Sequence, residues 1–354
     1  MVDELVKVLK MLAPGTSVRE GLENIVRAKA GALIVVAHGP EVEAVLDGGF
    51  AINIDFNPHY LYELAKMDGA IVVDDGFAHI LRVNTLLMPD AGIFSPETGS
   101  RHRAADRTAR QTGALIVAIS ERRGLITIYK GETRYILKDV PTILTKANQA
   151  LQTMEKYRSV LDQSLNSLSI LEFEDLVTLS DVVTAIQRAE MLNRVSSEIE
   201  RYVIELGNEG RLVNMQMEEL NAGAADEENL ILRDYVQDED VASIRQALQE
   251  RSSADLLDTV GIGKALGFVG MSTSLDLPVS PRGYRLLSKI PRLPFQLPGH
   301  VIDNLVKSFG TLQGIIEASL DDLDKVEGVG EVRAHMIKDG LKRLREEVFL
   351  GRRG

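Results

Sequence analysis

Short apolar runs alternate with amphipathic segments over the first 140 residues of the chain. The runs are rich in Val and Ile, are bounded by Gly, and cover 31–37, 69–75, 114–120 and 125–130. Such runs are typical of strands that are buried on both faces. The segments between them have helical spacing, with capping signals at Ser17 and at Asn57, which Pro58 follows. The alternation predicts an α/β domain over residues 1–140, with a central sheet flanked by helices.

The pattern changes in the middle of the chain, where no Gly or Pro occurs between Thr142 and Leu206. Apolar residues recur there at intervals of three and four, at Leu151, Met154, Tyr157, Leu161, Leu165 and Leu168. The stretch 220–240 is rich in Gly, Ala and acidic residues, which predicts a solvated surface connection or hinge. Residues 141–280 are therefore expected to form an all-α linker domain.

Residues 281–354 differ from the rest in charge. They contain 13 Lys and Arg against 10 Asp and Glu, in a chain whose net charge is −12. Segment 323–341 fits a helix-hairpin-helix, in which Gly328, Val329 and Gly330 form the hairpin. Backbone N–H groups of such a hairpin bind a DNA phosphate without reading the base sequence. A small DNA-binding domain is expected, and the alternative is a helical module for protein contacts.

Composition excludes several kinds of site. The chain has no Cys, and no two of its six His are four residues apart, which argues against disulfides, thiolate chemistry and a histidine-built zinc site. No apolar run is long enough to span a membrane, and Asp3 and Glu4 stand where a secretory signal would be basic. We expect a cytoplasmic protein with no membrane partner.

Basic side chains gather in one stretch, 97–110, of this acidic chain. Behind Gly99 and Ser100 come Arg101, His102, Arg103, Arg107 and Arg110. The helical pattern begins at about Arg103, so Arg101 and Arg103 are expected to precede a helix amino terminus, where anions bind. Paired arginines add bidentate donors for phosphate oxygens. Phosphate binding is favoured over the alternative, a solvated basic helix face.

A carboxylate upstream suits the same chemistry. Asp68 and Gly69 stand where the chain leaves a predicted helix and enters a predicted strand. Gly69 would allow a ligand to approach the backbone, and Asp68 could hold Mg²⁺ or Mn²⁺, because hard cations prefer carboxylate oxygen. From this stretch alone, a plain Asp-Gly turn is the stronger interpretation. Together with the arginines, however, Asp68 suits phosphoryl transfer.

The motifs DGA (68–70) and RHR (101–103), with the stretch 97–131 around the second, resemble the diadenylate cyclase family. The resemblance implies that two ATP molecules condense to cyclic di-AMP with release of two pyrophosphates. It implies catalytic roles for Asp68, Arg101, His102 and Arg103, with Asp68 as the metal ligand. The implied nucleotide-binding set comprises Gly69, Ala70, Leu87, Gly99, Ser100, Arg101, His102, Arg103, Ala104 and Ser120.

The implied contacts differ within this set. Leu87 would line the adenine pocket, and Ser120 would complete the nucleotide contacts. The sequence departs from the family at Ser100, which keeps a hydroxyl where Thr is usual, and at Ala104, which loses one. A hydroxyl contact to phosphate is therefore in doubt at Ala104.

The resemblance extends to the helical segment and the carboxy-terminal hairpin, and it implies further partners. The partners are a second copy, whose cyclase domain faces that of the first, and branched DNA such as Holliday junctions. The resemblance also implies a homo-octamer and a nucleoid-associated location. Two rival functions remain: a nucleotide-binding regulator without turnover, for which Ala104 is the best argument, and a structural DNA-junction protein. Since the nucleotide motifs all precede residue 121, deletion of 281–354 is expected to spare synthesis and remove DNA binding.

Overall fold

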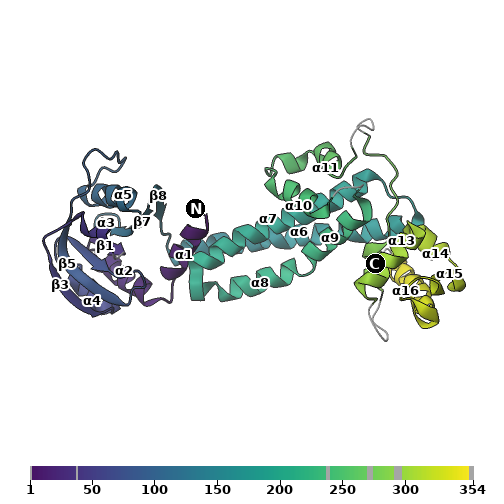
Figure 1. Cartoon of the computed structure of the whole chain (residues 1–354), viewed down its shortest axis with the longest axis horizontal. Coiled ribbons are helices and arrows are strands. Elements are labelled where there is room, and N and C mark those ends of the chain that lie inside the picture. Colours follow the sequence, from purple (N-terminus) through teal and green to yellow (C-terminus); the bar gives the residue numbers. More distant parts are fainter. Residues whose placement is uncertain (1, 37–38, 237–239, 269–273, 291–296, 351–354) are drawn as a thin grey trace. The chain divides into compact units, whose positions relative to one another are not determined.

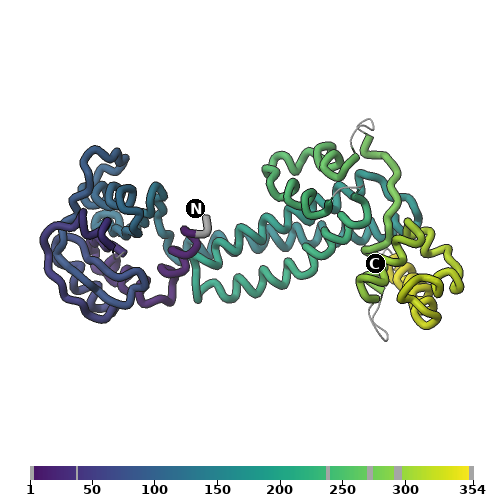
Figure 2. Tube along the Cα trace, in the orientation of Figure 1, coloured from purple at the N-terminus to yellow at the C-terminus, as the bar shows by residue number. Residues whose placement is uncertain are grey.

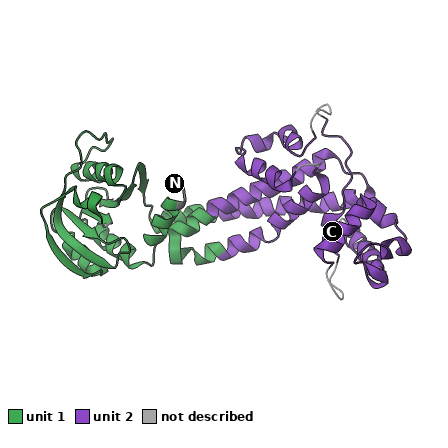
Figure 3. Cartoon of the chain, viewed as in Figure 1, with its two compact units in different colours: residues 1–148, 200–214 green, residues 149–199, 215–354 purple. Residues whose placement is uncertain are grey.

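A computed structural model gives the fold of the chain and describes residues 2–36, 39–236, 240–268, 274–290 and 297–350 (Figure 1, Figure 2). The chain divides into two compact units. Unit 1 is Met1–Asn148 with Glu200–Asn214, and unit 2 is Gln149–Ile199 with Met215–Gly354 (Figure 3). Each unit contains its own hydrophobic core. None of the described helices is long and apolar enough to cross a membrane.

Unit 1 is built on a sheet with the strand order β2-β5-β4-β1-β6-β7-β8, in which β3 also pairs with β5. The strands are β1 Ala32–Val36, β2 Leu46–Asp47, β3 Phe50–Asp55, β4 Ala70–Val73, β5 His79–Leu87, β6 Leu115–Ile119, β7 Ile126–Lys130 and β8 Thr133–Ile136. Strands β1 and β4 are parallel, and the other described pairs are antiparallel. The sheet with its helices confirms the predicted α/β class.

The strands predicted from apolar runs are those at the centre of the sheet. Strands β1, β4 and β6 are buried along their whole length, and β7 is buried except at its last residue. Strands β3 and β5 were not predicted, because exposed residues interrupt them. Each also contains a left-handed residue, Asn53 or Asn84, beside a shift of register.

Helices cover both faces of this sheet. The α-helices of unit 1 before residue 140 are α1 Val2–Met11, α2 Ser17–Arg27, α3 Pro40–Glu43, α4 Pro58–Leu64 and α5 Ser100–Thr112. Alternate residues of β1, such as Ile34, pack with α1, α2 and α4. The intervening residues, such as Val35, pack with Ala105 and Ala109 of α5. The second face of the sheet is therefore covered by α5, the helix that carries the predicted phosphate site.

Two helix starts test the predicted caps. Asn57 caps α4 as predicted, since its Oδ1 accepts a hydrogen bond of 2.9 Å from the His59 N–H and Pro58 follows it. The predicted cap at Ser17 is wrong. Thr16 caps α2 instead, accepting from the Arg19 N–H at 3.2 Å, because its extended backbone directs the hydroxyl at the first turn.

Long helices follow, as predicted. They are α6 Val140–Glu174 and α7 Leu179–Leu206, then the short η1 Gly207–Gly210 and α8 Arg211–Asn221. Five of the six predicted stripe positions on α6 are buried, namely Leu151, Met154, Leu161, Leu165 and Leu168, and Tyr157 is half-buried. Tertiary packing of an apolar stripe therefore stabilises this helix, as its spacing indicated.

The stretch 220–240, of which the structure describes all but 237–239, is not the solvated connection that was predicted. It forms α9 (Ala224–Tyr235), in which Ile231 and Leu232 are buried together with the acidic Glu228 and Asp234. Acidic residues made the segment look solvated, but unit 2 holds two of them in its interior by hydrogen bonds. After α9 come α10 Val241–Glu250, η2 Asp255–Leu257 and α11 Thr259–Ala265.

The carboxy-terminal segment is helical and shares a core with the end of α6. Its helices are α12 Tyr284–Ser288, α13 Gly299–Phe309, α14 Leu312–Glu317, α15 Leu320–Asp324 and α16 Gly330–Leu350. Phe173 of α6 packs in the same buried cluster as Leu286 and Ile337. The boundary predicted at residue 280 stays a prediction, but segments on either side of it are packed together.

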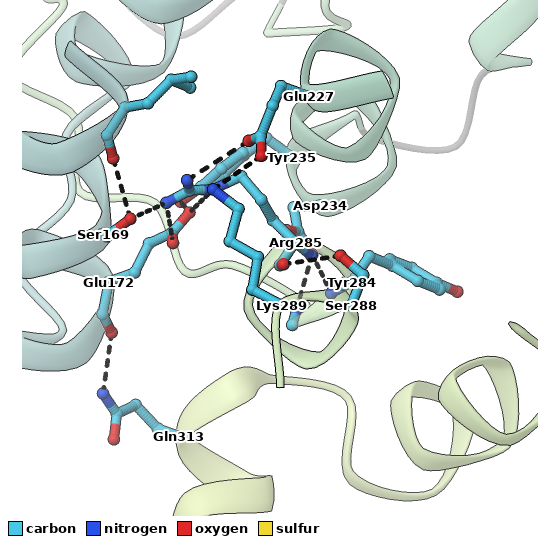
Figure 4. A network of polar contacts seen from close by, with 12 residues as sticks. Ser169, Glu172, Glu227, Asp234, Tyr235, Tyr284, Arg285, Ser288, Lys289 and Gln313 are labelled. Atoms are coloured by element: carbon cyan, nitrogen blue, oxygen red, sulfur yellow. Dashed lines mark hydrogen bonds and ion pairs between the residues drawn. The ribbon is translucent and has the colours of Figure 1, made fainter. Parts of the chain in front are cut away.

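A buried ionic network fastens α12 to α6 and α9 (Figure 4). The Arg285 side chain is 0% exposed, and it donates to Glu172, which is also 0% exposed, and to Ser169 Oγ at 3.0 Å. Tyr235 donates to Glu172 at 2.8 Å, and Glu227 lies 3.7 Å from Arg285 Nη1. Buried charges require such partners, because an unpaired buried charge is costly.

Asp234 of α9 caps α12 from another part of the chain. Its carboxylate accepts backbone hydrogen bonds from Gly283 and Tyr284 at 2.7 Å and from Arg285 at 2.9 Å. A short helix of five residues leaves most of its amino-terminal N–H groups without internal partners. The start of the carboxy-terminal segment is thus held by linker residues.

Candidate functional site

The DGA motif forms a tight junction between α4 and β4. Asp68 is exposed, Gly69 has a left-handed φ of 89°, and Ala70 begins β4 fully buried. A Cβ at Gly69 would lie 2.9 Å from backbone atoms of Asn84 and Thr85 in β5. Both the conformation and the close approach require glycine here. The motif therefore presents the Asp68 carboxylate at the surface on a closely packed loop.

The RHR motif lies inside a helix, contrary to the prediction that Arg101 and Arg103 precede it. Helix α5 begins at Ser100, with Gly99 as its N-cap at φ −82° and ψ 141°. No side chain of the described residues caps this end. The N–H groups of the first turn and the positive end of the helix dipole are thus available to an anion. The revised start strengthens the case for an anion site.

The two arginines of the motif have different contacts. The Arg101 guanidinium lies against Gly31, just before β1, where a Cβ would overlap its Nη1 atom. Arg103 donates at 3.2 Å to the carbonyl oxygens of Glu97 and Thr98 and so orders the loop before α5. Arg107 similarly donates at 2.8 Å to the Ile93 carbonyl. Part of the basic cluster therefore holds the loop in place.

His102 is half-buried beside the Tyr129 ring, with ring centroids 6.4 Å apart. Burial lowers the pKa of His102 below its ordinary value, and Arg101 adds to this effect while Glu97 opposes it. The imidazole is therefore neutral at pH 7. A neutral ring can both donate and accept a hydrogen bond.

Glu97 joins β7 and β8 to the loop before α5. It accepts hydrogen bonds from Tyr129 at 2.8 Å and from Arg134 at 2.5 Å. Burial raises the pKa of Glu97, but these two hydrogen bonds together with the positive charge of Arg134 bring the pKa below its ordinary value. The carboxylate is thus ionised and holds Arg134 next to the loop before α5.

A cavity of about 520 Å³ opens at the amino-terminal end of α5. Its lining residues are Glu97, Thr98, Gly99, His102, Ser120, Arg122, Arg123, Leu125, Thr127, Arg134 and Ile136. It brings together three residues of the predicted set, Gly99, His102 and Ser120. Three arginines and a helix amino terminus around one cavity favour a polyanionic ligand.

The other predicted residues do not line this cavity. They are Asp68, Gly69, Ala70, Leu87, Ser100, Arg101, Arg103 and Ala104. Ala70 nevertheless packs in one buried cluster with Ala105 of α5, and Leu87 packs against that cluster. The DGA loop, the end of β5 and the start of α5 therefore converge on one face of the sheet. The assigned roles of these residues stay predictions.

The sequence interpretation missed Arg122, Arg123, Thr127 and Arg134. Arg122 and Arg123 follow Ser120 closely, so their charge was a usable local signal. Arg134 gave no such signal, because the pairing of β7 with β8 brings it to the cavity.

A divalent metal fits the site only if the substrate supplies further ligands. Among the described residues, no three His, Asp or Glu side chains are grouped so that they could hold a metal ion. Asp68 offers one exposed carboxylate. Mg²⁺ is commonly bound by one or two carboxylates together with substrate phosphates and water, so one exposed carboxylate is compatible with that mode.

The predicted carboxy-terminal hairpin lies between α15 and α16. Gly328 and Gly330 have left-handed φ values of 85° and 65°. Val329 is 3% exposed and packs in the core, whereas Gly328 and Gly330 on either side of it are exposed. Asn304 of α13 donates at 2.9 Å to the Glu327 carbonyl and braces the hairpin.

Comparison with known proteins gives the family. Residues 19–134 match the model of the DisA bacterial checkpoint controller nucleotide-binding region, residues 137–275 match that of the DisA bacterial checkpoint controller linker region, and residues 311–340 match the helix-hairpin-helix motif. A DNA integrity scanning protein DisA of Clostridium kluyveri is 54% identical over 98% of this chain and 97% of its own length. The chain belongs to the DisA family.

Two further DisA relatives have the same extent. The protein of Clostridium perfringens is 53% identical over 99% of this chain and 98% of its own, and that of Acetivibrio thermocellus is 51% identical over 99% and 97%. Membership of the DisA family makes the chain an enzyme, a diadenylate cyclase of the nucleotidyltransferase class. The resemblance to the diadenylate cyclase family and the class of enzyme are confirmed. The predicted fold is confirmed as well: an α/β domain, then a helical linker domain, then a helix-hairpin-helix.

Proposed function

We propose that this protein condenses two ATP molecules into cyclic di-AMP at the interface of two apposed subunits. Each 3′-hydroxyl forms a bond to the α-phosphorus of the other ATP. The bond from that phosphorus to the oxygen bridging to the β-phosphate breaks, pyrophosphate leaves, and the hydroxyl proton passes to solvent. Two such steps close the ring and release two pyrophosphates. A two-fold axis between the subunits makes the steps equivalent.

The observation that supports this proposal most directly is the cavity at the start of α5. It combines unpaired helix N–H groups with His102, Ser120, Arg122, Arg123 and Arg134. Nucleotidyl transfer needs stabilisation of charge on phosphate oxygens rather than a covalent intermediate. The neutral His102 ring donates a hydrogen bond without adding charge, and the arginines hold the pyrophosphate part of ATP.

Asp68 holds Mg²⁺ or Mn²⁺ in this proposal. The ion, when bound, neutralises negative charge on the phosphates. Asp68 lies at the surface, so it can meet a nucleotide presented by a second subunit as well as one bound to its own. Ala70 and Leu87 bound the apolar face on which the adenine rests. Arg101 contacts phosphate from the first turn of α5.

The hairpin at Gly328–Gly330 is proposed to bind DNA phosphates. The relatives are named for DNA integrity scanning, and the two glycines of the hairpin are left-handed and exposed. One hairpin contacts few phosphates, so several copies in a homo-octamer would act together. This arrangement favours branched DNA such as Holliday junctions and association with the nucleoid.

The test of the proposed reaction is product analysis. Purified protein is incubated with ATP and Mn²⁺ or Mg²⁺, and cyclic di-AMP and pyrophosphate are quantified in parallel with an Asp68→Asn variant. We expect two pyrophosphates for each cyclic di-AMP, and no product from Asp68→Asn although it still binds ATP. Formation of only ADP or AMP would refute the proposal. Nucleotide binding without product from the wild type would favour a regulator that lacks turnover.

A further inference from the structure

Asn84 has an unusual backbone conformation for a residue inside a strand. Its φ is 53°, although it lies within β5. The pairing of β4 with β5 passes from Ala70–Thr85 to Val72–Arg82, so β5 contains one extra residue at this point. Such bulges are frequent beside active sites, and a backbone in a sparsely populated region persists only where its surroundings hold it.

The bulge contacts the DGA loop in two ways. The Asn84 side chain donates a hydrogen bond of 2.9 Å from Nδ2 to the Asp68 carbonyl oxygen. The Gly69 backbone lies so close to the bulge that a Cβ there would be 2.9 Å from the Asn84 carbonyl carbon and from Thr85 N. The backbone on either side of the Asp68–Gly69 peptide is thus fixed to β5.

The opposite side of the bulge is packed as closely. Gly49 has a φ of 70°, and a Cβ there would lie 2.6 Å from the Val83 carbonyl oxygen and 3.1 Å from that of Asn84. Two left-handed glycines, one from each neighbouring segment, therefore enclose the bulge. Neither segment leaves room for a shift of β5, so the bulge is a fixed reference point for the loop.

We propose that Asn84 is a positioning residue, whose amide and left-handed backbone hold the Asp68–Ala70 loop where the Asp68 carboxylate can bind a metal-nucleotide complex. The inference rests on the proposed function. Asn is suited to both tasks, because among residues with a Cβ it tolerates the left-handed region well and it carries a side-chain donor. The Asp68 carboxylate is exposed, so the backbone contacts are what restrict its position.

The decisive variants separate backbone from side chain. Asn84→Gly keeps access to the left-handed conformation and loses the donor. Asn84→Asp keeps the tolerance for that conformation but places a carboxylate against the Asp68 carbonyl. Asn53→Gly is the matched control, since Asn53 is also left-handed, in β3, between residues that pair with Arg82 and Ile80.

The main measurement does not depend on turnover. Binding of Mn²⁺ is followed by electron paramagnetic resonance in the presence of 3′-deoxy-ATP, which lacks the attacking hydroxyl. For Asn84→Gly we expect the Mn²⁺ concentration at half-saturation to rise about three- to tenfold, because one hydrogen bond is lost. The melting temperature should change little. With ATP as substrate, kcat of Asn84→Gly should fall below the wild-type value by a similar factor. KM for ATP should change little, because the substitution does not alter the nucleotide cavity.

Each outcome decides the inference. Wild-type Mn²⁺ binding in Asn84→Gly, or an equal loss in Asn53→Gly, would overturn it. If Asn84→Gly melts well below the wild type, folded Asn84→Asp decides instead: weakened Mn²⁺ binding supports the role, and unchanged binding overturns it. The two proposals can also fail separately. If the wild type makes no cyclic di-AMP but the Asn84 variants bind Mn²⁺ more weakly than the wild type, the proposed function is wrong and the positioning role is supported.

Discussion

Gly31 controls the position of Arg101. A Cβ at Gly31 would overlap Arg101 Nη1, the far end of a flexible side chain, and would lie 3.3 Å from the Ile119 carbonyl oxygen. Gly31→Ala should therefore displace the guanidinium while the fold accommodates the methyl group. We expect ATP affinity to fall roughly tenfold, as for one weakened charged hydrogen bond, with melting temperature almost unchanged. Calorimetric titration with 3′-deoxy-ATP measures the affinity.

Gly39→Ala is the control for Gly31→Ala. A Cβ at Gly39 would meet nothing within 4 Å, and its φ of 168° is ordinary extended backbone. This variant should bind ATP as the wild type does. Unchanged affinity in Gly31→Ala would show that Arg101 has a structural role and does not contact the nucleotide.

Single site residues could be predicted where their signal is local. Gly99 and His102 were found because unusual residue types stand together in the sequence, whereas Ser120 was implied by the family resemblance, and the structure brings these three to one cavity. Arg134 could not be found, since it meets Glu97, 37 residues away, through the folded sheet. The contact of Gly31 with Arg101 is equally non-local and left no pattern in the sequence.

Secondary structure elements were predictable where one physical requirement dominated. Strands such as β1 and β6 are buried on both faces, so they appear as continuous apolar runs. The bulged β5 breaks the two-residue period, and its irregularity is the feature that contacts Asp68. Helix α9 was missed because acidic residues, normally solvated, are buried in it with partners from other helices.

Glu228 in α9 should make unfolding depend on pH. Burial and the neighbouring Glu190 raise its pKa to about 7, against the attraction of Arg245 and the 2.9 Å hydrogen bond from Asn193. Between its ordinary pKa of 4.5 and about 7, the folded protein holds a proton that the unfolded chain releases. Stability from this group is thus full at low pH and is lost as pH rises, by up to about 3 kcal/mol.

Glu228→Gln removes this dependence, since the amide needs no proton to be neutral. Relative to the wild type, the variant should be similar in stability at about pH 4 and more stable at about pH 8, measured by differential scanning calorimetry. Glu219→Gln, the same change at an exposed position of α8, should follow the wild type at both pH values. Parallel curves for Glu228→Gln and the wild type would contradict the assignment.

At the scale of the whole molecule, deletion of 281–354 should destabilise what remains of unit 2. The deletion removes Arg285, the cation that pairs with Glu172, and leaves this carboxylate beside Asp234 and Tyr235 without it. It also exposes Phe173. We expect a lower melting temperature, partly restored by Glu172→Gln in the truncated chain. An unchanged melting temperature would show that the segment is independent, as the sequence analysis had assumed in predicting spared synthesis.

A point substitution is the cleaner test of DNA binding. Gly330 has a φ of 65°, and a Cβ there would meet nothing within 4 Å, so Gly330→Asp adds a carboxylate in open space at the hairpin. Asp tolerates the left-handed conformation, which keeps the strain small. The carboxylate should repel a DNA phosphate that approaches the backbone N–H groups, and affinity for a four-way junction should fall.

Gly223→Asp is the matched control for the expected loss of DNA affinity in Gly330→Asp. Gly223 has a φ of 73°, lies before α9 and is equally open, so the change in charge and in strain is the same. In gel retardation on four-way junction DNA over a range of salt concentrations, Gly330→Asp should bind more weakly than the wild type, and Gly223→Asp should bind as the wild type does. The salt dependence of Gly330→Asp should also be shallower, because the variant makes fewer phosphate contacts. Equal binding by Gly330→Asp and Gly223→Asp would mean that DNA contacts another surface of the protein.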